Sequence, residues 1–193
     1  MSGKAKPATA LKKGSLASII GIAAAALVMT TVPEDESGRK VDVKIAADGA
    51  ATVTHVRGPQ YLRTYLDIAG VPTACDGITK GIRLGQVYTE AQCAALLERE
   101  LVIHAQGVMN CSPGLQGEGR AYQRAAAVSL AYNIGVAGYC GSTAARRFNA
   151  GQYRAGCDAF MPWDKARVGG VLRPVQGLTN RRKRERALCL TGL

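Results

Sequence analysis

Carboxyl groups are the side chains with which this chain could do acid–base chemistry, and half of its 14 acidic residues lie between Glu34 and Asp76. Cleavage of a glycosidic bond requires two carboxyl groups that face each other across a cleft. One is protonated and assists the departure of the leaving oxygen, while the other is ionised and activates water or attacks the sugar. We consider Glu36 and Asp67 for these two roles.

Six short motifs, spread over nearly the whole chain, resemble those of one enzyme family. They are DESG from Asp35, YLDIAGVPT from Tyr65, CDGIT from Cys75, YTEAQC from Tyr88, SLAYNIG from Ser129, and GL through RR to LCL between Gly177 and Leu190. In these motifs the chain resembles the phage lysozymes of glycoside hydrolase family 24, in particular the endolysins exported on a signal-arrest-release anchor. The resemblance implies an α+β, lysozyme-like fold with a small β lobe, a larger helical lobe and a cleft between them, preceded by an N-terminal membrane helix.

The resemblance also implies a catalytic set of Glu, Asp and Thr, with eight residues between Glu and Asp and five between Asp and Thr. Asp67 and Thr73 fit the second spacing, but the position nine residues before Asp67 is Gly58. We assign the glutamate to Glu36 and explain the 22 additional residues largely by a hairpin inserted over residues 41–56. Because a hairpin begins and ends at nearly the same point, Glu36 can stay near Asp67.

These assignments predict a mechanism. Glu36, at the end of a short helix in apolar surroundings, would have a raised pKa and act as the general acid. Asp67 would stay ionised and orient or deprotonate the attacking water, which Thr73 would bind. Asn133 resembles a cleft-lining position, although a helix-capping role is equally open. The alternative for Glu36 is a solvated acid, for Asp67 an ordinary turn aspartate, and for Thr73 a plain strand threonine. The resemblance implies an inverting reaction, and the distance between the two carboxyl groups decides that outcome.

Four other residues near these motifs carry weaker expectations. Asp76 and Ile78 depart from the residue types that are usual in the family, which puts substrate contacts there in doubt. Neither histidine shows the pattern of a catalytic partner. We expect His55 to face Asp42 across the hairpin, and His104 to lie on the surface of a helix.

The charge balance indicates an affinity for polyanions. With 25 basic and 14 acidic residues the net charge is +11, which favours nucleic acids, anionic lipids or wall polymers as partners. No nucleic-acid-binding motif with interleaved aromatic residues is present, so we expect peptidoglycan and the inner membrane, and no nucleic acid. The RRKRER run over residues 181–186 is predicted to be a solvated helix face. We expect a monomer without cofactor or metal, since no C-x-x-C pair indicates zinc.

The six cysteines are an even number in a chain predicted to be exported, which indicates three disulfide bonds. Six cysteines allow 15 connectivities, so the sequence alone does not choose between them. The resemblance implies the pairs Cys75–Cys93, Cys111–Cys140 and Cys157–Cys189.

Residues 14–32 carry no charge, follow Lys12 and Lys13, and precede three consecutive acids. This pattern predicts a membrane segment with a cytoplasmic tail over residues 1–13 and an exported catalytic domain over residues 33–193. Alanine and glycine make the segment weakly hydrophobic, so we favour an anchor that can leave the bilayer over a cleaved signal peptide. The expected location is therefore the inner membrane first and the periplasm after release.

Local patterns predict the elements. The Asp48-Gly49 pair predicts a two-residue hairpin turn, which sets Ile45 opposite Thr52, Val43 opposite Thr54 and Val41 opposite Val56. Glycines over residues 61–87 indicate small strands and turns. A capping box at Thr89 predicts a helix to about residue 106. Further helices are expected over about 120–134, from 142 or 143 to near 151, over 153–161, and from a cap at Thr179 to about 190.

The favoured function is therefore a muramidase that cleaves the β-1,4 bond between N-acetylmuramic acid and N-acetylglucosamine for host cell lysis. One alternative is a lytic transglycosylase, which would need Glu36 but not Asp67. Another is a non-catalytic wall-binding protein on the same fold, if Glu36 lies outside the cleft.

Overall fold

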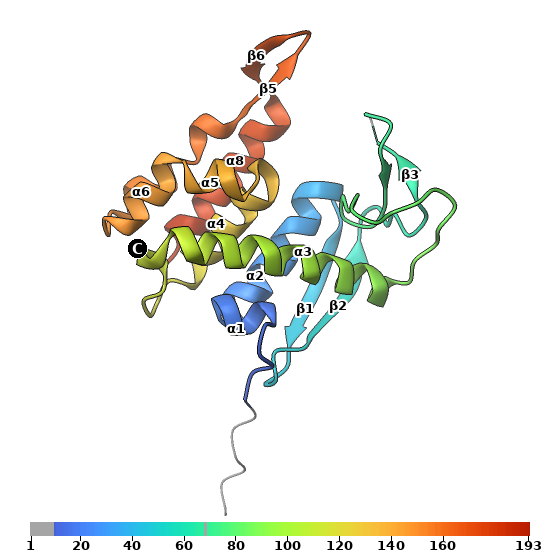
Figure 1. The fold of residues 1–193 in the computed structure, drawn as a ribbon, viewed down its shortest axis with the longest axis horizontal. Helices are drawn as coiled ribbons and strands as arrows, with labels where there is room; N and C mark the ends of the chain where they lie inside the picture. The colour runs from blue at the N-terminus through green and yellow to red at the C-terminus, as the bar shows by residue number, and fades with distance from the viewer. Residues whose placement is uncertain (1–9, 68) are drawn as a thin grey trace, which may run out of the picture.

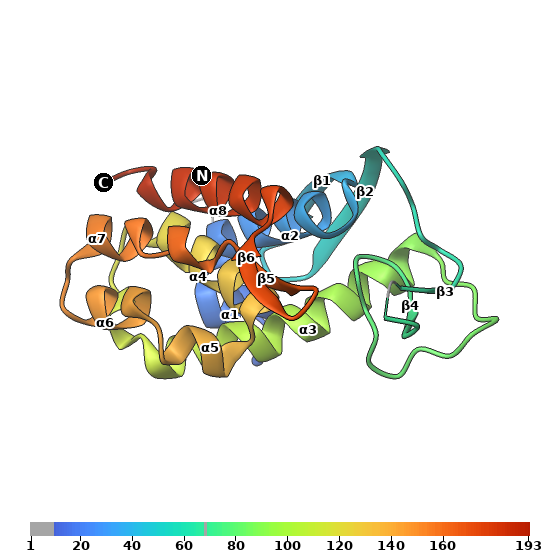
Figure 2. The ribbon, with the colours of Figure 1, turned by 90° about the horizontal axis from the view of Figure 1, so that it is seen from above.

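The computed structural model describes residues 10–67 and 69–193 and has a helical lobe and a smaller lobe (Figure 1; Figure 2). Residues 1–9 of the expected cytoplasmic tail lie outside the described residues. The long helix α3 (Glu90–Cys111) runs from the smaller lobe, which carries β3 (Tyr65–Leu66) and β4 (Pro72–Thr73), to the helical lobe, as Figure 2 shows. This arrangement is the α+β, lysozyme-like fold that the sequence motifs predicted.

The helical lobe is assembled around α4 (Ala121–Ile134). Every residue of α4 from Ala125 to Ala131 is buried, so the helix has no solvent-facing stripe. The surrounding elements are α1 (Leu16–Ile20), α2 (Ile22–Ser37), η1 (Pro113–Leu115), α5 (Val136–Cys140), α6 (Thr143–Asn149), α7 (Tyr153–Asp158), η2 (Met161–Trp163) and α8 (Gln176–Leu190). Because α4 is rich in alanine, its neighbours α2 and α8 can pack closely against it.

The apolar segment over residues 14–32 differs from the expected single helix. Gly21, with a φ of 86°, ends α1 and begins α2, and Ser15 caps α1 by accepting a hydrogen bond from the Ser18 backbone. Leu16, Ile20 and Val28 are almost completely buried in the main hydrophobic core. Within residues 10–67 and 69–193, no helix combines the length and the apolar character needed to cross a bilayer.

The expected hairpin forms from β1 (Lys40–Ile45) and β2 (Ala51–Arg57), but its register is shifted by one residue. The turn has three residues, closed by two 2.9 Å backbone hydrogen bonds from Ala46 to Ala50 and from Gly49 to Ala46, with Gly49 at positive φ. Pairing therefore sets Ile45 opposite Ala51 and Val43 opposite Val53. The shift turns Val53 toward the core and leaves Val56 exposed.

The two ends of this hairpin meet. Lys40 pairs with Arg57, and a Cβ atom at Gly58 would collide with the backbone of Gly38 and lie 3.2 Å from the Cα atom of Arg39. The 19 residues between Gly38 and Gly58 therefore leave and rejoin the fold at one point. The hairpin lies against α2 and α3, which supply the support that an isolated pair of strands lacks.

Most predicted helices form, with differences at their ends. The capping box at Thr89 is present, with Gln92 as its partner, but α3 continues to Cys111. The last helix begins at Gln176 instead of at a Thr179 cap, because Thr179 lies inside it and donates to the Val175 carbonyl and to Asp164. The short α5 and the hairpin of β5 (Lys165–Val168) and β6 (Val171–Pro174) were not predicted.

All three disulfide bonds implied by the family resemblance are present. Cys75–Cys93 joins the smaller lobe to α3, Cys111–Cys140 joins α3 to α5, and Cys157–Cys189 joins α7 to α8. Each therefore fixes an element of one lobe to a helix that is distant in sequence, which restricts the unfolded chain.

Candidate active site

Glu36 lies in the last turn of α2, at the junction between the lobes. Its side chain is 22% exposed, and its Oε1 atom accepts a hydrogen bond of 2.5 Å from the Nη1 atom of Arg181 in α8. Its Oε2 atom faces Gly77 in the smaller lobe, where a Cβ atom would lie 3.3 Å away. The prediction of apolar surroundings for Glu36 is thus wrong, because a buried guanidinium donates a hydrogen bond to one of its two carboxylate oxygens.

Arg181 belongs to a buried charge cluster that the sequence analysis placed in solvent. Arg181, Arg182 and Glu185 are each less than 5% exposed, so this half of the RRKRER run is not a solvated face, whereas Lys183, Arg184 and Arg186 are in contact with solvent. Glu185 pairs with both arginines and accepts a hydrogen bond of 2.8 Å from Ser129 in α4. Burial lowers the pKa of Arg181, but the carboxylates of Glu36 and Glu185 outweigh burial and leave that pKa raised. The cluster therefore keeps a charged donor fixed beside Glu36.

Glu36 lines a cavity of about 250 Å³ between the lobes. The other lining residues are Gly77, Ile78, Thr79, Lys80, Glu100, His104, Tyr132 and Asn133. Asn133 is thus on the same wall as Glu36, at the end of α4. His104 is half-buried with its ring 5.1 Å from that of Tyr132, so it is not the plain surface residue that the sequence suggested.

Tyr132 also lines this cavity, and in the sequence it stands out only as part of the SLAYNIG motif. Its hydroxyl donates to the Asp76 carbonyl at 3.3 Å. Burial raises the pKa of this hydroxyl well above its ordinary value, and the charges of Glu36, Asp76 and Glu100 raise it further. Tyr132 therefore remains a neutral hydrogen-bond donor in the cavity wall at any physiological pH.

Asp67 and Thr73 do not line the same cavity as Glu36; they lie on β3–β4 of the smaller lobe. The Oδ1 atom of Asp67 accepts hydrogen bonds of 2.8 Å from the backbone of Ala69 and of Val71, which holds the turn between the two strands. Among the described residues, no hydrogen bond engages its Oδ2 atom. Thr73 is buried, and its hydroxyl donates to the Val71 carbonyl at 3.0 Å.

The hydroxyl of Tyr65, in β3, connects the two halves of the site electrostatically. Burial raises its pKa, and the charges of Tyr61, Asp67, Glu36 and Asp76 raise it further. Asp67 and Glu36 therefore both act on one phenol, although 31 positions separate them in the sequence.

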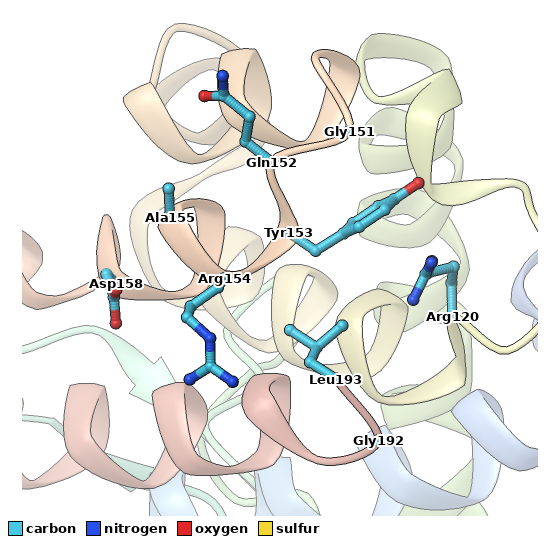
Figure 3. Close-up of a pocket in the computed structure, with 9 residues that line it drawn as sticks. All are labelled: Arg120, Gly151, Gln152, Tyr153, Arg154, Ala155, Asp158, Gly192 and Leu193. Carbon is cyan, nitrogen blue, oxygen red and sulfur yellow. The ribbon is translucent and has the colours of Figure 1, made fainter.

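A larger cavity, of about 790 Å³, lies at the far end of the helical lobe (Figure 3). Figure 3 shows the guanidinium of Arg120 beside the ring of Tyr153, with 3.8 Å from its carbon to the ring centre. Of the nine residues that line this cavity, Asp158 is the one acid, and it is paired with Arg186 at 2.6 Å. A single paired carboxylate does not meet the requirement for glycosidic cleavage, so this larger cavity is not the candidate site.

The expected pairing of His55 with Asp42 is wrong. In the observed register Asp42 lies opposite Thr54, while His55 lies opposite Val41 on the other face. The one-residue shift of the turn accounts for this difference, because successive side chains of a strand point to opposite faces.

Comparison with known proteins identifies the family. The sequence model of the phage lysozyme family matches residues 59–185. The chain belongs to the phage lysozyme family. It is 38% identical to the SAR-endolysin of Enterobacteria phage P21 over 138 residues, which are 71% of this chain and 79% of that protein. It is 33% identical to the SAR-endolysin of Pseudomonas phage phiKMV over 126 residues, 65% of this chain and 76% of that protein.

Two solved structures share the fold of this chain. The muramidase domain of SpmX from Asticaccaulis excentricus matches with a TM-score of 0.61 and 26% identity, over 69% of this chain and 88% of that one. The active form of the P1 phage endolysin Lyz shares the fold, with a TM-score of 0.65 at 23% identity, over 90% of this chain and 86% of that one. This phage lysozyme is therefore a lysozyme-type glycoside hydrolase, an endolysin that acts on peptidoglycan.

Proposed function

We propose that this phage lysozyme cleaves the β-1,4 bond between N-acetylmuramic acid and N-acetylglucosamine, with Glu36 as the proton donor. The observation that carries the proposal is the position of Glu36, held by Arg181 in a cavity between the lobes. A sugar bound in this cavity would bring its glycosidic oxygen to the Glu36 side chain. Glu36 then protonates the leaving oxygen as the glycosidic bond breaks.

Asp67 and Thr73 supply the second half of the proposed mechanism from the smaller lobe. Two backbone N–H groups engage the Oδ1 atom of Asp67, so its Oδ2 atom is the one available to orient and deprotonate water. The Thr73 hydroxyl donates a hydrogen bond to the Val71 carbonyl, so its oxygen can accept a hydrogen bond from the same water. Asn133, on the wall shared with Glu36, contacts the bound sugar.

Product analysis on purified peptidoglycan tests the reaction. Hydrolysis adds water across the bond, so we expect each cleavage to create one new reducing end. A lytic transglycosylase would instead close a 1,6-anhydro ring on the muramic acid and create no reducing end. If anhydro products form in stoichiometric amount, the enzyme is a lytic transglycosylase and the proposed hydrolysis is wrong. If no bond is cleaved, the protein is a non-catalytic wall-binding protein.

The proposal assigns residues 1–13 to a cytoplasmic tail, residues 14–32 to a membrane anchor, and residues 33–193 to the catalytic domain that acts in the periplasm. The names of the relatives, SAR-endolysins, support this assignment. The segment has no charge, and its many alanines favour bilayer insertion only weakly. The same small residues fit closely against α4 after release, and α2 then brings Glu36 to the cavity.

N-terminal sequencing of the soluble enzyme, collected after collapse of the membrane potential, tests this assignment. Because residues 16–32 fill the core of the folded enzyme, we expect the released protein to retain Met1 or Ser2. A soluble active enzyme that begins near Leu27 would show that the segment is a cleaved signal peptide.

A further inference from the structure

Arg39 and Asp76 form a buried ion pair beside the candidate active site. The Nε and Nη2 atoms of Arg39 donate to the two oxygens of Asp76 at 3.0 and 2.6 Å. The two side chains are 4% and 1% exposed. Ser37 adds a hydrogen bond of 3.0 Å to the same carboxylate, and the Nη1 atom of Arg39 reaches Glu90 at 3.3 Å. Each oxygen of Asp76 thus has a donor with fixed direction.

This pair joins three segments that meet at the cavity. Ser37 and Arg39 flank the end of α2, Asp76 lies in a tight turn of the smaller lobe, and Glu90 begins α3. Because α2 also carries Glu36, the ion pair fixes the distance between the helix that holds the proposed proton donor and the turn that faces it.

The turn over residues 74–78 needs such support. It is closed by two backbone hydrogen bonds of 2.9 Å between Ala74 and Ile78. Cys75 has a φ of 56°, a left-handed conformation that costs free energy for a residue with a side chain. A strained turn keeps its shape only when its surroundings hold it, and Asp76 is the side chain by which this turn is held to Arg39.

The same turn is in direct contact with the proposed proton donor. Gly77 lies close to Glu36: a Cβ atom added at Gly77 would be only 3.3 Å from the Oε2 atom of Glu36. The backbone carbonyl of Asp76 accepts the hydroxyl of Tyr132, which lines the cavity. A movement of Asp76 would therefore move both the wall opposite Glu36 and a hydrogen bond of the cavity.

We propose that Arg39 and Asp76 are a positioning pair for the glycosidic cleavage, which holds the 74–78 turn against Glu36 so that the scissile oxygen and the carboxyl group are aligned. This inference rests on the proposed function of Glu36. Neither residue touches the substrate; each acts through Glu36 and the turn. A guanidinium is suited to this role because its planar fork fixes the orientation as well as the distance of a carboxylate.

The test compares Asp76→Asn with wild type by kcat and KM on soluble glycan fragments, at a temperature where near-ultraviolet circular dichroism shows both to be folded. Displacement of catalytic groups by about 1 Å can cost about 10²-fold in rate, so we expect kcat to fall about 10- to 100-fold and KM to change by less than about threefold. Arg39→Lys should act alike, because an ammonium cannot engage both oxygens of Asp76. The double variant should lose no more kcat than the less active of the two single variants, since the two residues act as one unit.

Lys40→Gln is the matched control, because Lys40 forms an exposed ion pair with Glu34 one residue away from Arg39. We expect it to keep kcat within about twofold of wild type, as surface pairs contribute little. If Asp76→Asn does not fold, Glu90→Gln is used instead. It removes only the negative charge that Arg39 reaches at 3.3 Å, on a side chain that is 32% exposed, and it should lower kcat about two- to fivefold.

Three outcomes would overturn the inference: a wild-type kcat in the folded Asp76→Asn and Arg39→Lys variants, a loss that appears only in KM, or a wild-type kcat in Glu90→Gln where it is the variant used. A parallel assay of Glu36→Gln separates this result from the proposed function. If Glu36→Gln is inactive and these variants have wild-type kcat, only the positioning role fails. If Glu36→Gln is active, the proposed function itself fails.

Discussion

Replacement of Glu36 with glutamine is expected to lower kcat for peptidoglycan cleavage by about 10²- to 10⁴-fold, the usual contribution of a general acid. Glutamine has the same shape and still offers an oxygen to Arg181, so the 2.5 Å contact that orients the side chain can persist. It carries no acidic proton to give to the leaving oxygen. The loss should therefore appear in kcat, with little change in the melting temperature.

The rate of turbidity loss of a wall suspension and kcat on soluble fragments both measure this effect. Glu34→Gln is the matched control, because Glu34 lies in the same helical turn but is 40% exposed and paired only with Lys40. We expect the control to retain wild-type activity. Similar losses in both variants would mean that charge at the end of α2, and not proton donation by Glu36, supports the reaction.

Replacement of Asp67 with asparagine is expected to lower kcat by about 10²-fold or more, since the charge that activates water is removed. The asparagine oxygen can still accept the hydrogen bonds from Ala69 and Val71, so the turn between β3 and β4 should be kept. Asp48→Asn is the matched control, because its Oδ1 atom accepts a backbone hydrogen bond of 3.0 Å from Ala50 in the hairpin turn.

The pair of variants also separates hydrolysis from transglycosylation. A hydrolase needs both carboxyl groups, whereas a transglycosylase needs the proton donor alone. Wild-type kcat in Asp67→Asn together with an inactive Glu36→Gln would therefore contradict the role proposed for Asp67 and favour the transglycosylase.

Local chemistry allowed much of the fold to be predicted from the sequence. The capping box at Thr89 and the positive φ of Gly135 define helix ends through local features that involve only nearby residues. The inserted hairpin was predictable for the same reason, since Asp48 and Gly49 favour a turn wherever the flanking strands lie. The three disulfide bonds followed from the family resemblance and not from the spacing of the cysteines.

The features that were mispredicted depend on distant partners. Arg181 and Arg182 look like solvent-facing residues within their own helix. They are buried with Glu185 by the packing of α8 against α4, and Arg181 is also paired with Glu36 of α2. The apolar segment over residues 14–32 is buried in the main hydrophobic core, and its own composition does not reveal that packing. The hairpin register depends on one residue in the turn, which the Asp-Gly pair alone does not decide.

The central claim is that Glu36 reaches the same bound glycan as Asp67 despite the hairpin inserted between them. A crystal structure of the Glu36→Gln variant with a peptidoglycan fragment tests it most directly. We expect the scissile glycosidic oxygen within about 2.6–3.2 Å of the side chain at position 36, with Asp67 on the opposite side of the sugar. A fragment bound instead in the cavity beside Tyr153, with position 36 in contact only with solvent, would contradict this account.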